Sequence, residues 1–160
     1  MSIKVGDAIP NVKISKMGEK GPEPVETGAL FNVGRAVLFA VPGAFTPTCS
    51  ARHLPGFVDK ADEIKAKGVD LLACISVNDA FVMGAWGKAH DAGGKVVMLA
   101  DGNGDFTRAM GRDFDGSGFG MGRRSQRYAL IAEKGKVTHL FVEEPGKFEV
   151  SAAEYVLKNL

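Results

Sequence analysis

The sequence predicts one α/β domain over residues 1–160, with a mixed central sheet flanked by helices on both faces. Two patterns indicate this class. Predicted strands and helices alternate through residues 35–112, which is typical of parallel strands joined by crossover helices. Two consecutive strands joined by a tight turn then follow, and such strands pair antiparallel. A length of 160 residues is enough for one domain with its own hydrophobic core.

The first elements are expected at the edge of the sheet. Spaced apolar residues at positions 2–16 are interrupted by Gly6 and Pro10, which is typical of short edge strands or a hairpin. Positions 16–28 are polar and rich in glycine and proline, so they predict a loop. The apolar run at 35–41 predicts the first central strand.

Apolar residues then recur at every third or fourth position and predict an amphipathic helix over residues 49–67. Pro47 suits the start of this helix and Gly68 its end. We expect a kink at Pro55, because a proline ring clashes with the carbonyl four residues before it.

The later elements follow from similar patterns. Residues 69–77 are almost continuously apolar, as in a strand buried on both faces. Asn78 or Asp79 is expected to cap a helix that extends to about residue 90. The remaining predictions are a strand at 96–100, a helix at 104–112, a glycine-rich loop at 111–122, strands at 126–132 and 136–142, and a helix at 151–160 capped by Ser151.

Composition and charge exclude several classes of protein. The 20 basic and 19 acidic residues give a formal net charge of +1, so no bulk charge indicates binding to nucleic acid or a membrane. No apolar run approaches the roughly 20 residues of a membrane span. The first residues resemble neither a signal peptide nor a transit peptide, so we expect a cytoplasmic location. Two cysteines and three scattered histidines predict neither a disulfide framework nor a metal site.

Cys49 is the candidate for a reactive residue. It ends the stretch PGAFTPTC, between the first central strand and the helix that follows. At this edge of the sheet, free N–H groups and the positive end of the helix dipole stabilise an anion such as a thiolate. On position alone, an inert buried cysteine explains the pattern equally well. Cys74 lies within a buried strand, where we expect a structural role, and it could resolve Cys49 only after local unfolding.

At this stretch the sequence resembles the peroxiredoxins. Pro42-x-x-x-Thr46-x-x-Cys49 is similar to their active-site motif, and PGAFTPTCS resembles the version in the type-II subgroup, also called peroxiredoxin V. Further segments similar to this subgroup occur in order along nearly the whole chain: KVGDAIP, HLPGF, SVNDAFV, GKVVMLAD and RRSQRYAL. The resemblance implies a thioredoxin-like fold and thiol-dependent reduction of hydrogen peroxide and alkyl hydroperoxides, an antioxidant role in cell redox homeostasis.

The resemblance also implies a role for each motif residue. It makes Cys49 the peroxidatic cysteine, Thr46 the hydroxyl that orients the peroxide, and Pro42 a shield for the thiolate. On spacing alone, Thr46 is equally explained as a helix cap. The catalytic arginine of the family stands at the start of a late strand, a position that matches Arg127, with Arg124 as the alternative. No cofactor is implied beyond an external thiol reductant.

Ionisation of the thiol cannot by itself account for such a reaction. A thiol with a pKa near 8.5 is ~3% ionised at pH 7, so full ionisation gains about 30-fold, or ~2 kcal/mol. Enzymes commonly need ~8 kcal/mol or more. We therefore expect the Thr46 hydroxyl, the Cys49 N–H and a guanidinium to stabilise the breaking O–O bond, without a general base.

The reductant is expected to come from outside the chain. Some members of the subgroup carry a resolving cysteine near the C-terminal helix, whereas the corresponding residues 148–151 contain none. We therefore expect the sulfenic acid on Cys49 to be resolved by glutathione with glutaredoxin or, as the second choice, by thioredoxin. The resemblance also implies a homodimer whose contact lies near the active-site loops.

Three other functions compete with a peroxidase. The first is a redox sensor or thioredoxin-fold binding module without turnover. The second is a disulfide oxidoreductase, against which the absence of a CxxC motif argues. The third is a cysteine hydrolase, which would need a paired histidine base such as His53. We expect His53 and Arg52 to support the site or lie at the surface. Phe45 and Phe119 are candidates for the core, an interface, or an apolar mouth that admits alkyl hydroperoxides.

Overall fold

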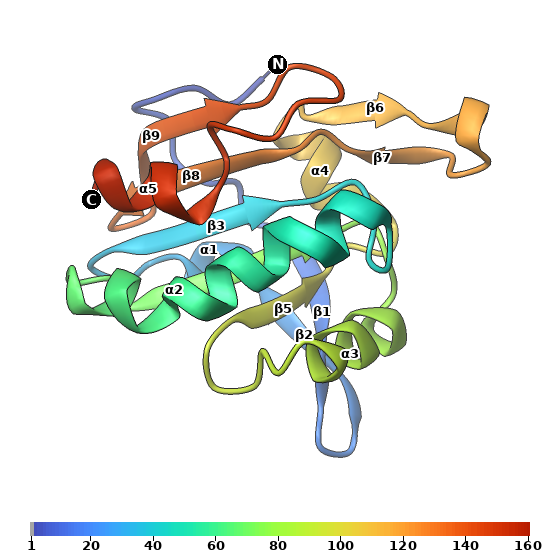
Figure 1. Cartoon of the computed structure of the whole chain (residues 1–160), viewed down its shortest axis with the longest axis horizontal. Helices are drawn as coiled ribbons and strands as arrows, with labels where there is room; N and C mark the ends of the chain where they lie inside the picture. Colours follow the sequence, from blue (N-terminus) through green and yellow to red (C-terminus); the bar gives the residue numbers. More distant parts are fainter. Residues whose placement is uncertain (1) are drawn as a thin grey trace.

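A seven-stranded sheet forms the centre of the structure, a computed structural model that describes residues 2–160 (Figure 1). Strands β3, β4 and β5 pair parallel, and the remaining neighbours pair antiparallel, so the predicted mixed sheet is confirmed. The strands, in spatial order, are β2 (Gly21–Glu26), β1 (Lys13–Gly18), β5 (Val97–Ala100), β4 (Leu71–Ser76), β3 (Ala36–Ala40), β8 (Tyr128–Glu133) and β9 (Lys136–Val142).

Helices cover both faces of this sheet, as predicted. Helices α2 (Leu54–Ala66), α3 (Ala80–Ala89) and α5 (Ala153–Lys158) pack on one face, and α4 (Asp105–Ala109) and the end of α1 (Thr27–Leu30) on the other. None of the helices in residues 2–160 has both the length and the apolarity needed to cross a membrane.

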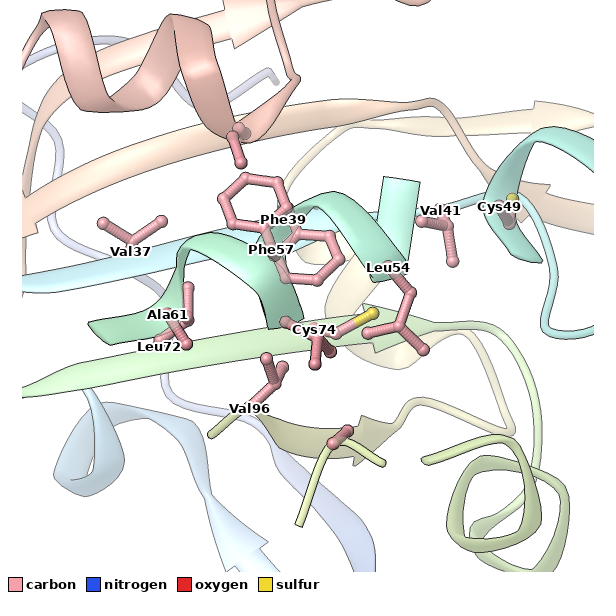
Figure 2. Close-up of a cluster of buried hydrophobic side chains, with 14 of the residues drawn as sticks. Val37, Phe39, Val41, Cys49, Leu54, Phe57, Ala61, Leu72, Cys74 and Val96 are labelled. Atoms are coloured by element: carbon pink, nitrogen blue, oxygen red, sulfur yellow. The ribbon is translucent and has the colours of Figure 1, made fainter. Parts of the chain in front are cut away.

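Strand β3 shows how alternation builds the two cores. Val37 and Phe39 point into the cluster beneath α2, whereas Leu38 points into the opposite cluster, and all three are fully buried. The ring of Phe39 stacks on that of Phe57 from α2, with centroids 4.0 Å apart and an interplanar angle of 6° (Figure 2). This packing fixes α2 over the strand that leads to the Cys49 stretch.

The loop predicted at 16–28 is largely a hairpin of β1 and β2. Pro22 and Pro24 lie in β2, opposite Met17 and Ser15. Because β2 is the edge strand and pairs with β1 alone, the missing N–H groups of the two prolines can face away from the sheet. Prolines disfavour a central strand, and the sequence therefore indicated a loop. That prediction was wrong, because the two prolines lie in an edge strand.

The predicted glycine-rich loop at 111–122 contains the first strand of a second, smaller sheet. Strands β6 (Asp113–Asp115) and β7 (Arg123–Ser125) pair antiparallel and are joined through a 3₁₀ turn at Ser117–Phe119. Gly120 and Gly122 have φ values of 71° and 66°, which glycine adopts without steric cost. Figure 1 shows this β6–β7 hairpin projecting beyond the main sheet.

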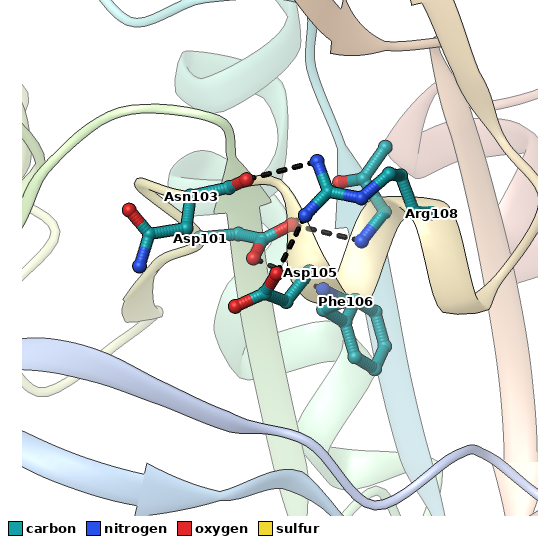
Figure 3. A network of polar contacts seen from close by, with 6 residues as sticks. Asp101, Asn103, Asp105, Phe106 and Arg108 are labelled. Atoms are coloured by element: carbon teal, nitrogen blue, oxygen red, sulfur yellow. Dashed lines mark hydrogen bonds and ion pairs between the residues drawn. The ribbon is translucent and has the colours of Figure 1, made fainter.

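A buried carboxylate fixes α4 at the end of β5 (Figure 3). Asp101 accepts hydrogen bonds from the N–H of Phe106 at 3.1 Å and from the N–H and hydroxyl of Thr107 at 2.8 and 2.7 Å. Arg108 adds an ion pair with Asp105. Burial raises the pKa of Asp101, while the bonds from Thr107 oppose that shift. We infer a structural role for this network.

Candidate active site

Cys49 begins a π-helical turn, Cys49–His53, that leads into α2. The N–H of Leu54 donates to the Cys49 carbonyl, five residues back. Pro55 explains the wider turn, because it lacks an N–H and its ring excludes the carbonyl of Ala51 from the α-helical position. The helix predicted at 49–67 is confirmed, with a first turn that is π-helical instead of α-helical. The irregularity expected at Pro55 takes the form of this π turn.

Arg127 reaches the sulfur from the start of β8. Its Nη2 donates to the Sγ of Cys49 at 3.0 Å, although 78 residues separate the two in sequence. A guanidinium at this distance stabilises negative charge on sulfur. Cys49 itself is fully buried.

His53 holds the other side of the same guanidinium. Arg127 Nη1 lies 2.8 Å from His53 Nδ1, and the Ser151 carbonyl lies 3.0 Å from Nε2. Arginine can only donate, so Nδ1 accepts and the proton sits on Nε2, from which it is donated to Ser151. Burial, together with the charge of Arg127, lowers the pKa of His53 to about 3. The ring is thus neutral and its one acceptor nitrogen is occupied, which argues against a cysteine hydrolase.

Thr46 and Pro42 lie in the loop between β3 and the π turn. The Thr46 hydroxyl donates to the Gly43 carbonyl at 2.6 Å, and the Thr46 carbonyl accepts from Ser50 N–H at 2.9 Å. Phe45, between them, has a φ of 62°, a left-handed conformation that non-glycine residues rarely adopt. A Cβ atom at Gly43 would come within 2.9 Å of Arg124 Nη1 and 3.1 Å of the Thr46 methyl group, so these side chains would have to shift.

Arg124 fixes this loop from the side of the β6–β7 hairpin. Its Nη1 donates to the Pro42 carbonyl at 3.3 Å and its Nε to the Met121 carbonyl at 2.9 Å. Of the two arginines considered from the sequence, Arg127 is the one placed against Cys49. Arg124 supports the surrounding backbone.

Asn78 is a supporting residue for which the sequence suggested a different role. Asp79 caps α3 by accepting from the Val82 N–H at 2.9 Å. Asn78 instead accepts from the Ala44 N–H at 3.0 Å and from the Ser76 hydroxyl at 2.6 Å, tying the end of β4 to the loop before Cys49. Its position just after the carboxyl end of a central strand was a signal for this role.

A pocket of about 570 Å³ opens beside the guanidinium of Arg127. Pro42 and Phe119 line it, and Phe119 is 83% exposed. Phe45 is also exposed but lies outside the lining, so only one of the two aromatic residues suggested as a mouth faces this pocket. The other lining residues are Thr48, Phe114, Gln126 and residues 143–147.

Cys74 belongs to the same buried cluster as Cys49 and is also a free thiol (Figure 2). Burial raises its pKa well above the ordinary value, and the nearby Cys49 adds to this effect. The expected burial of Cys74 is confirmed. Within residues 2–160, no three His, Cys, Asp or Glu side chains are gathered as ligands for a metal ion.

Comparisons with known proteins agree with this geometry. The Redoxin family profile matches residues 4–157. Peroxiredoxin-2E-2, chloroplastic, from Oryza sativa subsp. japonica is 52% identical over 164 residues, covering 99% of this chain and 73% of the relative. Peroxiredoxin-2B from Arabidopsis thaliana is 45% identical over 161 residues, covering 99% and 98%.

A solved structure extends the likeness to three dimensions. Reduced Prx3 in complex with H₂O₂ from Vibrio vulnificus superimposes with a TM-score of 0.94 at 53% identity, covering 98% of both chains. The chain is therefore a thiol-dependent peroxidase with a thioredoxin-like fold, and it belongs to the redoxin family and, within it, to the type-II peroxiredoxins.

Proposed function

We propose that the chain reduces hydrogen peroxide and alkyl hydroperoxides at Cys49, with Arg127 stabilising charge on both the sulfur and the peroxide. The observation that carries this proposal is the 3.0 Å contact between Arg127 Nη2 and Cys49 Sγ, since Arg127 also lines the 570 Å³ pocket, which Cys49 does not. The Vibrio vulnificus relative, solved in complex with H₂O₂, supports hydrogen peroxide as one substrate.

In the first step the thiolate attacks the hydroxyl oxygen of the peroxide. An S–O bond forms, the O–O bond breaks, and the departing oxygen takes up a proton, leaving a sulfenic acid and an alcohol or water. The sulfur loses two electrons and the peroxide gains them. Arg127 stays charged throughout, so it can stabilise the negative charge that moves from sulfur to oxygen. His53 cannot serve as a base, because its acceptor nitrogen is held by Arg127.

Thr46 and Pro42 shape the place where the peroxide binds. Because the Thr46 hydroxyl donates its hydrogen to the Gly43 carbonyl, its oxygen can only accept a hydrogen bond from the O–H of a peroxide. This role differs from the donor role expected from the sequence. Pro42 lines the pocket, and its apolar ring carries no N–H that could bind water there.

In the second step an external thiol attacks the sulfenic sulfur, releasing water and forming a mixed disulfide. The buried Cys74 and the absence of cysteine in residues 148–151 favour an external reductant. We propose glutathione with glutaredoxin, and thioredoxin as the second candidate. No metal or organic cofactor takes part in this cycle.

Peroxide consumption with each reductant tests this assignment. We expect repeated turnover with glutathione and glutaredoxin, its loss in Cys49→Ser, and its retention in Cys74→Ser. Turnover in Cys49→Ser would refute the assignment of the nucleophile. A single turnover with either reductant would favour a redox sensor. Loss of turnover in a folded Cys74→Ser variant would show that Cys74 resolves the sulfenic acid.

We further propose a homodimer formed near the active-site loops. The side chains of Phe45 and Phe119 are 57% and 83% accessible, and such exposed apolar groups favour a contact of this kind. Sedimentation of the wild type and of Phe45→Ser tests it, with dissociation expected in the variant. The cytoplasmic location and the single domain over residues 1–160 stay predictions from the sequence.

A further inference from the structure

A carboxylate on the far side of His53 lies outside the mechanism described so far. Glu143 follows β9, and its Oε2 accepts three hydrogen bonds: from Glu149 N–H at 2.6 Å, Ser151 N–H at 2.9 Å and the Ser151 hydroxyl at 2.7 Å. Burial pushes the pKa of Glu143 up, but these bonds outweigh it and hold the pKa below its ordinary value. One oxygen atom therefore fixes the turn that precedes α5.

This turn differs from the one expected from the sequence. Ser151 was predicted to cap the C-terminal helix, but α5 begins at Ala153 with no side-chain cap, and the Ser151 hydroxyl points to Glu143 instead. Ser151 is fully buried. The result is that the Ser151 carbonyl faces His53 and accepts from Nε2 at 3.0 Å.

That carbonyl and Arg127 together decide which nitrogen of His53 carries the proton. With Ser151 accepting at Nε2, Nδ1 is left as an acceptor for Arg127. In the other tautomer, an N–H at Nδ1 would meet an N–H of the guanidinium, and the contact would be repulsive. The Ser151 carbonyl thus keeps the side of His53 that faces Arg127 able to accept.

Arg127 transmits this constraint to the sulfur. Its planar guanidinium places Nη1 on His53 and Nη2 on Cys49, so holding one nitrogen also aims the other. Phe148, in the same fixed turn, covers the pair, with its ring 4.9 Å from that of His53 and 5.9 Å from the Arg127 guanidinium carbon. This ring shields the contact from water.

We propose that Glu143 is a positioning residue for Arg127, acting through the Ser151 carbonyl and the tautomer of His53. This inference rests on the proposed role of Arg127 in activating the peroxide. This role differs from an effect of the Glu143 charge on the pocket, because it requires only that the oxygen at the Oε2 position accept the hydrogen bonds of the turn. It also differs from a general contribution to stability, because it acts on the proton of one ring.

Substitutions at Glu143 separate these possibilities. All three donors converge on one oxygen, so Glu143→Gln keeps an acceptor there while removing the charge, and Glu143→Ala removes both. We expect Glu143→Ala to slow the reaction of Cys49 with hydrogen peroxide on the order of 10-fold, the scale on which outer partners of site residues act. Glu143→Gln should stay within about 3-fold of the wild type. Glu154→Ala, an exposed glutamate in the first turn of α5, is the control.

The decisive readout is the tautomer of His53, read from the ¹⁵N chemical shifts of its two ring nitrogens. In the wild type and Glu143→Gln we expect the proton on Nε2, and in Glu143→Ala a mixture of the two forms. An unchanged tautomer in Glu143→Ala would overturn the proposal, as would equal rates for the Gln and Ala variants. Should Glu143→Ala fail to fold, Glu143→Asp decides, because its carboxylate falls one methylene short of the three donors.

An Arg127→Gln background separates this inference from the proposed function. If Glu143 acts through Arg127, Glu143→Ala should have no further effect on the rate there. A persisting 10-fold effect would refute the relay through Arg127. An unchanged rate in Arg127→Gln alone would refute the role of Arg127 in catalysis. The effect of Glu143 on the His53 tautomer would still be tested separately by the ¹⁵N shifts.

Discussion

Replacing Arg127 by glutamine removes the charge that contacts Cys49 Sγ on one side and His53 Nδ1 on the other. The variant loses two effects that can be measured apart. One is the stabilisation of the thiolate before peroxide binds. The other is the stabilisation of the oxygen that leaves as the O–O bond breaks.

The sizes of the two effects differ. Stabilising the thiolate gains at most about 30-fold at pH 7, because a thiol with a pKa near 8.5 is already ~3% ionised there. Removing one donor from an oxyanion site costs about 10²–10³-fold, or ~2.7–4 kcal/mol. We therefore expect Arg127→Gln to lose on the order of 10³-fold at pH 7, and still about 10²-fold when the rate is divided by the fraction of thiolate.

Trp86 offers a signal for this assay. It is the one tryptophan in the sequence, and its indole N–H donates at 3.0 Å to the hydroxyl of Ser50, the residue after Cys49. Stopped-flow fluorescence should therefore follow oxidation of Cys49, with the ultraviolet absorbance of the thiolate measured in parallel. Arg123→Gln is the matched control, since Arg123 is exposed and lies 3.7 Å from Asp113 of the hairpin. A loss of less than about 3-fold in the rate per thiolate would mean that Arg127 only ionises the thiol.

Three further predictions follow from other contacts. The pKa of His53 is about 3 in the folded chain and near 6.5 in the unfolded chain, so protonation favours unfolding. The free energy of unfolding should therefore fall as the pH drops from 6.5 towards 3, by up to about 4–5 kcal/mol. Urea unfolding at several pH values should show this slope in the wild type and not in His53→Gln. Asn78→Ala leaves the Ala44 N–H without its partner, so we expect a loss of about 1–3 kcal/mol in urea unfolding together with slower peroxide reduction; an unchanged rate would show that the loop holds its shape without Asn78. Phe119→Ala should lower the rate for alkyl hydroperoxides relative to hydrogen peroxide without changing stability, whereas equal rate changes would exclude a mouth role for this ring.

The central strands could be predicted because their burial is reflected in the apolar residues of the strands themselves. Strands β3 and β4 are buried at every position, and their sequences are correspondingly apolar except at Ser76. The edge elements were harder, because their local signals have two interpretations. Pro22 and Pro24 exclude a central strand but not an edge strand, and only the sheet order shows which applies.

The site divides in the same way. Cys49 follows a buried strand at a helix start, and Arg127 precedes the run of β8, so each has a local signal that the family motif reinforces. His53 and Ser151 lie 98 residues apart and meet only because α5 packs against α2. The sequence around either residue contains no pattern that predicts the hydrogen bond between them. The role of Glu143 could not be predicted from the sequence for the same reason, since it depends on how the backbone turns before α5.

The two cysteines show which features make one buried thiol reactive. Both are fully buried in the same cluster, so exposure does not distinguish them. Burial raises the pKa of Cys74 in the middle of β4, whereas Cys49 has a guanidinium 3.0 Å from its sulfur at the start of a helical turn. That guanidinium is itself aimed by a neutral His53, which a protonated ring could not do. The reactivity of Cys49 therefore depends on keeping a proton off one nitrogen of His53 as much as on any group that touches the sulfur.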